Sequence, residues 1–207
     1  MKVAKKVALI GASGSIGSRL LAELSARGHA VTAIARNPDK IAALPGVTAV
    51  KGDVFDKDRL ARLIAGHDAV ISAVHFSASD PQILLASVRQ SGVQRYLVVG
   101  GAGSLEVAPG VKLFDTLEFP AVYLDEARKG GAFLDLLKQE QGLDWTFLSP
   151  SALIQPGERT GKFRLGADQL LVDAKGNSAI SAEDYAIALV DELEKPAHSR
   201  RRFTVGY

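Results

Sequence analysis

The chain of 207 residues is 47% apolar, which is enough to bury a full hydrophobic core in one domain. It has no cysteine, which excludes disulfides, thiolate catalysis and cysteine-ligated metal, and we expect no metal site. Its formal charge is +2, and we interpret the basic run 200–202 as a solvated approach to a last strand rather than a nucleic-acid patch.

The apolar run near the N-terminus breaks at Gly11 after about five residues, so it is shorter than the apolar core of a signal peptide or a membrane span. We therefore expect a cytoplasmic protein that binds no membrane.

Strand patterns alternate with helix patterns along the chain. The predicted strands are, in order, 6–11, 30–35, 47–52, 68–74, 95–100, 144–149 and 202–206. The first, fourth and fifth are continuously apolar, as strands covered on both faces of a parallel sheet are. Repeated strand–helix–strand units imply right-handed crossovers. We therefore predict an α/β fold, a doubly wound parallel sheet that forms a single Rossmann-like domain over residues 1–207.

Capping residues mark the ends of two helices. Asp80 and Pro81 supply an N-cap and a first-turn proline, and Gly92 follows the last turn of the same helix. Ser181 with Asp184 three residues later resembles a capping box, although aspartate is a weaker partner there than glutamate.

Two segments interrupt the alternation. Residues 101–121 lack periodicity and contain two prolines, so we predict a loop. Residues 150–180 contain several turn signals and a predicted hairpin across "AKGN" (174–177). Both segments follow a strand directly and should emerge at the carboxyl edge of the sheet, where ligands bind in this architecture. We expect them to form the substrate pocket.

A glycine-rich turn, "GASGSIG", directly follows the first strand and opens the first helix. Dinucleotide binding needs one glycine for the tight turn, one for the approach of the pyrophosphate and one for helix–strand packing. The helix N-terminus then offers N–H groups to phosphate oxygens, and serine hydroxyls add donors. The candidate cofactor-binding residues of this turn are Gly11, Ser13, Gly14, Ser15, Ile16 and Gly17. The alternative is a purely structural turn.

Further cofactor candidates follow the next strands. Arg36 ends the second strand, where a guanidinium suits the 2′-phosphate of NADP, unless it is a solvated surface arginine. After the third strand, Asp53 and Val54 would flank the adenine, although Asp53 is nearly as well explained as a turn cap. After the fourth and fifth strands come Ala73, Val74, His75 and Gly100. His75 and the adjacent Phe76 line a nicotinamide or substrate pocket, unless the histidine is a packed or solvated loop residue.

With these residues placed, the sequence resembles the atypical short-chain dehydrogenase/reductase group of NmrA-like NAD(P)H-binding proteins. Within that group it is similar to the NADH-flavin reductases and, more distantly, to biliverdin reductase B. The resemblance covers nearly the whole chain, through "GASGSIG", "KGDVFD", "VVGGAGSLE", "DWTFLSPS", "GERTGKFRLGADQLLVD", "ISAEDYAIALVDELE" and "RFTVGY". It implies a Rossmann-like domain that binds NADP(H). Some members reduce flavins or quinones, and others bind the dinucleotide as a redox signal.

The sequence departs from the wider superfamily at the catalytic positions. A serine usually follows the fifth strand closely, but here the first hydroxyl is Ser104, after four residues without one. The lysine expected one helical turn after Tyr123 is replaced by Ala127. Lys129 comes six residues after Tyr123, about 600° around a helix, and points about 120° away from it. Ser104 and Tyr123 remain the catalytic candidates, without the usual lysine.

The missing lysine favours one class of acceptor. Reducing a ketone creates an alkoxide that needs a positioned acid, whereas a flavin or quinone takes its proton from solvent. We therefore predict an NADPH-dependent oxidoreductase that acts on a flavin or quinone-like acceptor, as a monomer or homodimer. The alternative is a non-catalytic NADP(H)-binding redox sensor. A nucleotide-sugar epimerase is disfavoured, because the chain lacks room for a substrate domain.

Overall fold

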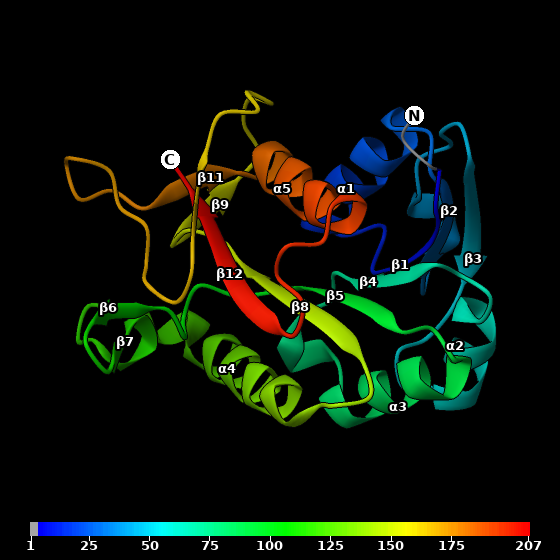
Figure 1. The fold of residues 1–207 in the computed structure, drawn as a ribbon, viewed down its shortest axis with the longest axis horizontal. Helices are drawn as coiled ribbons and strands as arrows, with labels where there is room; N and C mark the ends of the chain where they lie inside the picture. The colour runs from blue at the N-terminus through cyan, green and yellow to red at the C-terminus, as the bar shows by residue number, and fades with distance from the viewer. Residues whose placement is uncertain (1–3) are drawn as a thin grey trace.

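A computed structural model describes residues 4–207, so the first three residues of the expected domain lie outside the described range. Its centre is one eight-stranded sheet in the order β10-β12-β8-β5-β4-β1-β2-β3 (Figure 1). The parallel strands are β1 (Lys6–Ile10), β2 (Ala30–Ala35), β3 (Val47–Lys51), β4 (Ala69–Ser72), β5 (Arg95–Val99), β8 (Asp144–Ser149) and β12 (Arg201–Gly206). The antiparallel edge strand is β10 (Arg164–Gly166). The seven predicted strands and the doubly wound parallel sheet are confirmed.

Within residues 4–207, five α-helices cover the two faces of this sheet (Figure 1). One face packs against α1 (Ser15–Ala26) and α5 (Ala182–Glu194). The other packs against α2 (Lys57–Ile64), α3 (Pro81–Ser91) and α4 (Leu124–Gln139). None of the helices in residues 4–207 has the length and apolar character needed to span a membrane.

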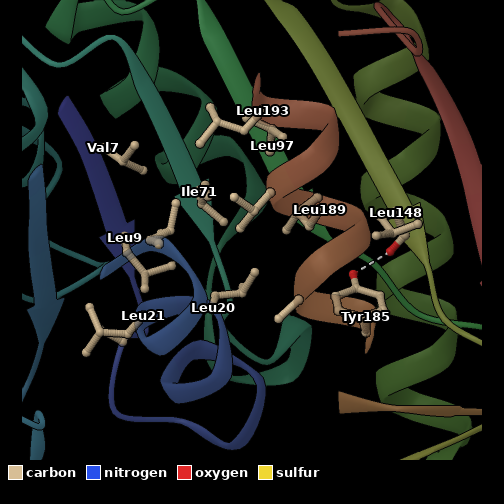
Figure 2. Packing of buried hydrophobic residues seen from close by; sticks show 14 of the residues in the cluster. Val7, Leu9, Leu20, Leu21, Ile71, Leu97, Leu148, Tyr185, Leu189 and Leu193 are labelled. Carbon is tan, nitrogen blue, oxygen red and sulfur yellow. Dashed lines mark hydrogen bonds between the residues drawn. The ribbon is translucent and has the colours of Figure 1, made fainter. Parts of the chain in front are cut away.

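The continuously apolar strands are buried on both sides, as their composition predicts. In β1, Val7 and Leu9 join the cluster under α1 and α5, while Ala8 and Ile10 join the cluster under α2, α3 and α4. Figure 2 shows the first cluster, in which the Tyr185 hydroxyl donates a hydrogen bond to a backbone carbonyl of β8 at 2.7 Å. Burial raises the pKa of the Tyr185 phenol, so this buried donor stays neutral.

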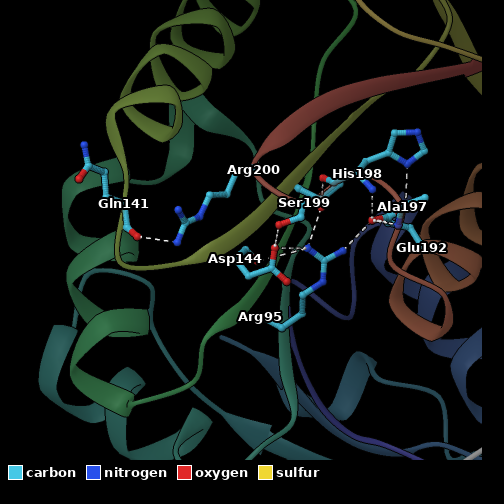
Figure 3. A network of polar contacts seen from close by, with 9 residues as sticks. Arg95, Gln141, Asp144, Glu192, Ala197, His198, Ser199 and Arg200 are labelled. Carbon is cyan, nitrogen blue, oxygen red and sulfur yellow. Dashed lines mark hydrogen bonds and ion pairs between the residues drawn. The ribbon is translucent and has the colours of Figure 1, made fainter.

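The amino edge of the sheet is closed by a polar network (Figure 3). Arg95, at the start of β5, donates to Glu192 of α5 at 2.8 Å and to Thr146 of β8 at 2.7 Å. Glu192 also contacts the ring nitrogen Nδ1 of His198 at 2.8 Å. These bonds compensate for burying the Glu192 carboxylate, which is 3% exposed. The network ties α5 to the sheet at the edge opposite the carboxyl ends of the strands.

Three local predictions need correction. The segment 101–121 is not a featureless loop, because it contains the small hairpin of β6 (Glu106–Ala108) and β7 (Val111–Lys112) and two single 3₁₀ turns, η3 (Leu113–Asp115) and η4 (Ala121–Tyr123). The hairpin across "AKGN" is also wrong. A turn does form there, but the flanking β11 (Ala179–Ser181) pairs in parallel with the distant β9 (Leu153–Gln155).

The third correction concerns the capping box at α5. Ser181 accepts the N–H of Asp184 at 3.0 Å, as expected for an N-cap. The Asp184 carboxylate does not return the bond. It accepts the N–H groups of Thr160 and Gly161, each at 2.8 Å, and the hydroxyl of Tyr207 at 2.8 Å. The start of α5 therefore anchors the loop at 160–161 and the last residue of the chain.

Capping elsewhere follows the sequence. Asp80 caps α3 by accepting N–H groups of the first turn, Pro81 is its first residue, and Gly92 ends it with φ +79°. Two further 3₁₀ turns, η1 (Pro38–Lys40) and η2 (Phe76–Ala78), follow β2 and β4. They place residues 36–37 and 75–76 at the carboxyl edge.

Candidate active site

A cavity of about 750 Å³ opens at the carboxyl ends of β1, β2, β4, β5 and β8. From β1 the chain runs to β2 and β3 on one side of the sheet order, and from β3 it crosses past β1 to β4 on the other side. This reversal is the topological switch point at which doubly wound sheets bind ligands. The predicted site residues that line the cavity are Gly11, Ser13, Gly14, Ser15, Ile16, Arg36, Val54, Ala73, Val74, His75, Gly100 and Tyr123.

The glycine turn has the geometry that a dinucleotide cradle requires. Gly11 has φ +83°, and a Cβ there would lie 2.4 Å from the Ala73 carbonyl oxygen. A Cβ at Gly17 would lie 2.0 Å from the Gly11 carbonyl oxygen, so Gly17 packs the helix on the turn and does not itself line the cavity. A Cβ at Gly14 has no neighbour nearer than 3.3 Å. Of the three glycines, Gly14 is therefore the one at which an added Cβ meets the mildest contact, and it also lies on the cavity wall.

Helix α1 begins at this turn without a side-chain cap, because its N-cap residue is Gly14. The N–H groups of its first turn have no acceptor within the helix and are available to phosphate oxygens. Ser13 and Ser15 line the cavity beside them. These backbone donors and hydroxyls fit a pyrophosphate.

Of the cofactor candidates that follow β2 and β3, two line the cavity and one does not. Arg36 is exposed at the cavity wall, and no described residue accepts a hydrogen bond from its guanidinium. Val54 lines the cavity with Gly52. Asp53 does not line it. Its carboxylate accepts the N–H of Phe55 at 3.0 Å, which is the turn-capping role that the sequence left open.

His75 and Glu126 meet across the end of β4. The His75 side chain is 83% exposed, and its Nδ1 lies 3.4 Å from a Glu126 carboxylate oxygen. That carboxylate also accepts the N–H groups of Phe76 and Ser77, each at 2.8 Å. Burial raises the pKa of Glu126, but the hydrogen bonds from Ser77 and Phe76 outweigh it and lower the pKa below its ordinary value. The Glu126 carboxylate is therefore ionised, and it lies on the wall of the cavity.

The structure does not bring Ser104 into the cavity. Ser104 is buried, and Arg202 of β12 donates to both its hydroxyl and its carbonyl oxygen, at 2.9 and 3.0 Å. Arg202 also donates to the Asp168 carboxylate at 2.6 Å. Through Arg202, Ser104 in the segment 101–121 is linked to Asp168 in the segment 150–180. The Ser104 hydroxyl is therefore not placed to polarise a substrate.

Tyr123 lines the cavity at the N-terminus of α4 and is 62% exposed. Ala127, one turn later, also lines it. Lys129 points elsewhere and pairs with Asp125 at 2.9 Å on the exposed side of α4. The tyrosine therefore has no ammonium beside it from its own helix, as the spacing predicts.

Phe76 lines the cavity beside His75, as the sequence predicts, but the packing that holds its ring there was not predicted. Phe76 stacks on Phe147 with ring centroids 6.1 Å apart, and it reaches this place because Gly130 of α4 has no side chain. A Cβ at Gly130 would lie 2.8 Å from the Phe76 ring. The pair "GG" within a helix was the available signal for a close packing contact. Leu113, Glu118 and Phe119 line the cavity from the segment 101–121, and Leu153 and Ile154 from the segment 150–180, as expected of these two segments. Glu126 is a wall residue outside both segments that the sequence did not single out.

The chain matches the model of a family described as NAD(P)H-binding over residues 11–196. Three solved structures are similar over nearly the whole length of both chains, and each has a provisional name. A Burkholderia pseudomallei protein named as exported is 48% identical, with TM-score 0.89 over 98% of this chain and 100% of the other. A Bacteroides thetaiotaomicron protein named as an epimerase is 45% identical, with TM-score 0.94 over 99% and 98%. A Streptococcus pneumoniae protein named as an NADH-flavin reductase is 39% identical, with TM-score 0.82 over 98% and 99%.

The three names differ, and so the relatives agree on the fold rather than on a reaction. The family match begins at Gly11, the first glycine of the cradle, and covers the ends of β2, β4, β5 and β8 that line the cavity. On this match and on the geometry of the glycine turn, the chain belongs to the NAD(P)H-binding family of Rossmann-fold proteins.

Proposed function

We propose that this protein is an NADPH-dependent oxidoreductase that transfers a hydride to a flavin or quinone-like acceptor. The observation that supports it best is the division of one cavity into two halves. One half has the glycine cradle and Arg36, and the other has aromatic and aliphatic walls without a tyrosine–lysine pair. The similarity to the Streptococcus protein named as an NADH-flavin reductase agrees with this reading.

The cradle half fits a phosphorylated dinucleotide. The space at Gly14 and the uncapped start of α1 suit the pyrophosphate. Arg36, whose guanidinium has no acceptor among the described residues, supplies the donor that a 2′-phosphate needs. We therefore propose NADP(H) rather than NAD(H) as the cofactor.

The acceptor half provides shape more than acid–base chemistry. When bound, NADPH supplies a hydride from C4 of its nicotinamide, and the acceptor gains this hydride and one proton. Phe76, Phe119 and Tyr123 line the region where a flat ring would lie against the nicotinamide. Holding two reacting groups at the right distance and angle is itself a large catalytic contribution.

The proton requires no dedicated donor in this scheme. A reduced flavin or quinone spreads its charge over a conjugated ring and exchanges protons readily with water. Tyr123 is 62% exposed, so water reaches this end of the cavity. The replacement of the usual lysine by Ala127 is therefore compatible with these acceptors and not with simple ketones.

A second function, a redox sensor that binds NADP(H) without turnover, is favoured by the apolar rim of the cavity. Leu117 is 99% exposed and Val122 is 82% exposed, beside the cavity residues Phe119 and Tyr123. A protein partner could cover these side chains in one dinucleotide state.

Stopped-flow mixing separates the two functions. The protein is premixed with NADPH and then with riboflavin, FMN or a naphthoquinone, and the near-ultraviolet absorbance of NADPH is followed. We expect rapid loss of this absorbance with at least one acceptor, and a much slower loss in Gly14→Val. Tight NADPH binding with no loss for any acceptor would contradict the enzyme and support the sensor.

A further inference from the structure

The charged residues of the cavity are distributed unevenly between its two halves. Among the lining residues within 4–207, the one arginine or lysine is Arg36, at the end of β2. The carboxylates are Glu118 and Glu126, which lie in the segment before α4 and in its first turn. In the sheet order, β1 separates β2 from β4, so the cation and the two carboxylates stand on opposite sides of the switch point.

Glu118 is an uncompensated charge. It is exposed, and no described residue forms an ion pair or hydrogen bond with its carboxylate. Its neighbours Leu117 and Phe119 are apolar, so an acceptor that covers the rim meets hydrocarbon and one negative charge. Glu126 adds a second carboxylate, which the N–H groups of Phe76 and Ser77 hold in place.

The helix that borders this half offers no anion site. The N-terminus of α4 lies at the cavity, where a helix dipole would otherwise attract negative charge. Its first turn contains Asp125 and Glu126, which already occupy the positive end of the dipole. Arg128 and Lys129, the cations of α4 nearest to that turn, do not line the cavity, and Lys129 is paired with Asp125.

We propose that the acceptor site selects ring compounds without a phosphate, sulfonate or carboxylate group. This inference rests on the proposed function and narrows its acceptor. The apolar and aromatic walls bind a flat ring, while Glu118 and Glu126 repel an anionic substituent, for which the lining residues within 4–207 offer no arginine or lysine on this side of the cavity. Uncharged flavins and quinones are therefore bound in preference to their anionic counterparts.

Riboflavin and FMN are a matched pair for this test, because they share one ring system and differ in a phosphate of charge about −2. Each is titrated by flavin fluorescence into the protein saturated with NADP⁺, so that binding is measured without turnover. Two carboxylates acting on that phosphate across roughly 10 Å at low ionic strength weaken FMN about tenfold relative to riboflavin. Added salt should raise the affinity for FMN and leave that for riboflavin nearly unchanged.

Charge variants locate the effect. Glu118→Lys should lower the riboflavin preference at least about threefold, and Glu118→Gln should lower it by a smaller factor. Asp135→Lys is the matched control, because it makes the same change of charge at an exposed α4 position that does not line the cavity. It should leave the preference unchanged.

A second pair, menadione and a naphthoquinone sulfonate, repeats the comparison with steady-state oxidation of NADPH. Equal affinities within both pairs, or a preference that Glu118→Lys does not move, would overturn the inference while the oxidoreductase stands. Failure of all four compounds to bind or react would overturn the proposed function, and this inference with it.

Discussion

Replacing Gly14 by valine separates cofactor binding from folding more cleanly than any other change in the glycine turn. Gly14 has φ −76° and ψ 172°, a backbone conformation that valine adopts without strain. A Cβ there would lie 3.3 Å from the Gly11 carbonyl oxygen and 3.9 Å from that of Ala73, which is close but tolerable. We expect a change in the free energy of unfolding within about 1 kcal/mol, mostly from the poorer N-cap.

The affinity for NADPH should change far more. The valine side chain takes the space in which the pyrophosphate meets the first N–H groups of α1. Losing one hydrogen bond to a charged group costs about 1.5–3 kcal/mol. That loss corresponds to a rise in Kd of roughly 10- to 150-fold. Isothermal titration calorimetry measures the affinity, and thermal unfolding followed by circular dichroism measures the stability.

The other glycines of the turn provide the contrast. Gly17→Ala would place a Cβ 2.0 Å from the Gly11 carbonyl oxygen, so the helix must shift and the melting temperature should fall by several degrees. Gly14→Val should shift it by no more than about 4 °C. The milder Gly14→Ala should reproduce the direction of the binding loss. Unchanged NADPH affinity in a folded Gly14→Val protein would refute the cradle.

Three further predictions concern Arg36, Tyr123 and Glu126. Arg36→Ala should abolish most of a preference for NADPH over NADH of about 1.5–3 kcal/mol, measured calorimetrically. Equal Kd values for the two dinucleotides in the unmodified protein would sink this assignment. Tyr123→Phe should slow flavin or quinone reduction by no more than roughly tenfold, since one neutral hydrogen bond is worth about 0.5–1.5 kcal/mol. A loss of about a thousandfold in steady-state kinetics would instead make the tyrosine a catalytic acid. For Glu126, burial raises the pKa, but hydrogen bonds from Ser77 and Phe76 lower it below the ordinary 4.5. The ionised carboxylate therefore stabilises the folded protein above pH 4.5, and this stabilisation is lost as pH falls through the folded pKa. The unfolding free energy should therefore drop more steeply below about pH 4.5 in the unmodified protein than in Glu126→Gln, and identical slopes in urea denaturation would contradict the role of this carboxylate.

The sheet and the glycine turn could be predicted because their signals are local. A strand buried on both faces needs an apolar run, and residues 7–10 of β1, 69–71 of β4 and 96–99 of β5 form such runs. The turn needs its glycines within seven consecutive residues. At this range, composition and spacing contain the physical constraint, and the family match over residues 11–196 agrees with it.

The errors concern partners that are distant along the chain. Ser104 is fixed by Arg202, which is 98 residues away, and no pattern around either residue announces the bond. Glu126 accepts the N–H of Phe76 from 50 residues away. The turn residues at 174–177 were correctly identified, but the strand that follows them pairs with β9 instead of folding back on its own neighbour.

The hydrogen bonds of Arg202 determine which part of the acceptor pocket can change its sequence without disturbing the rest of the fold. Arg202 joins Ser104 to Asp168, and backbone bonds between Glu106 and residues 168–170 run alongside it, so the bases of the two flanking segments form one rigid unit. Past Phe114, the backbone bonds described for residues 115–123 close only local turns. The side chains of residues 115–123, and even the length of this segment, can therefore change while the glycine turn that forms the dinucleotide cradle keeps its shape. Grafting residues 115–123 between homologues is a route to new acceptor preferences on an unchanged frame.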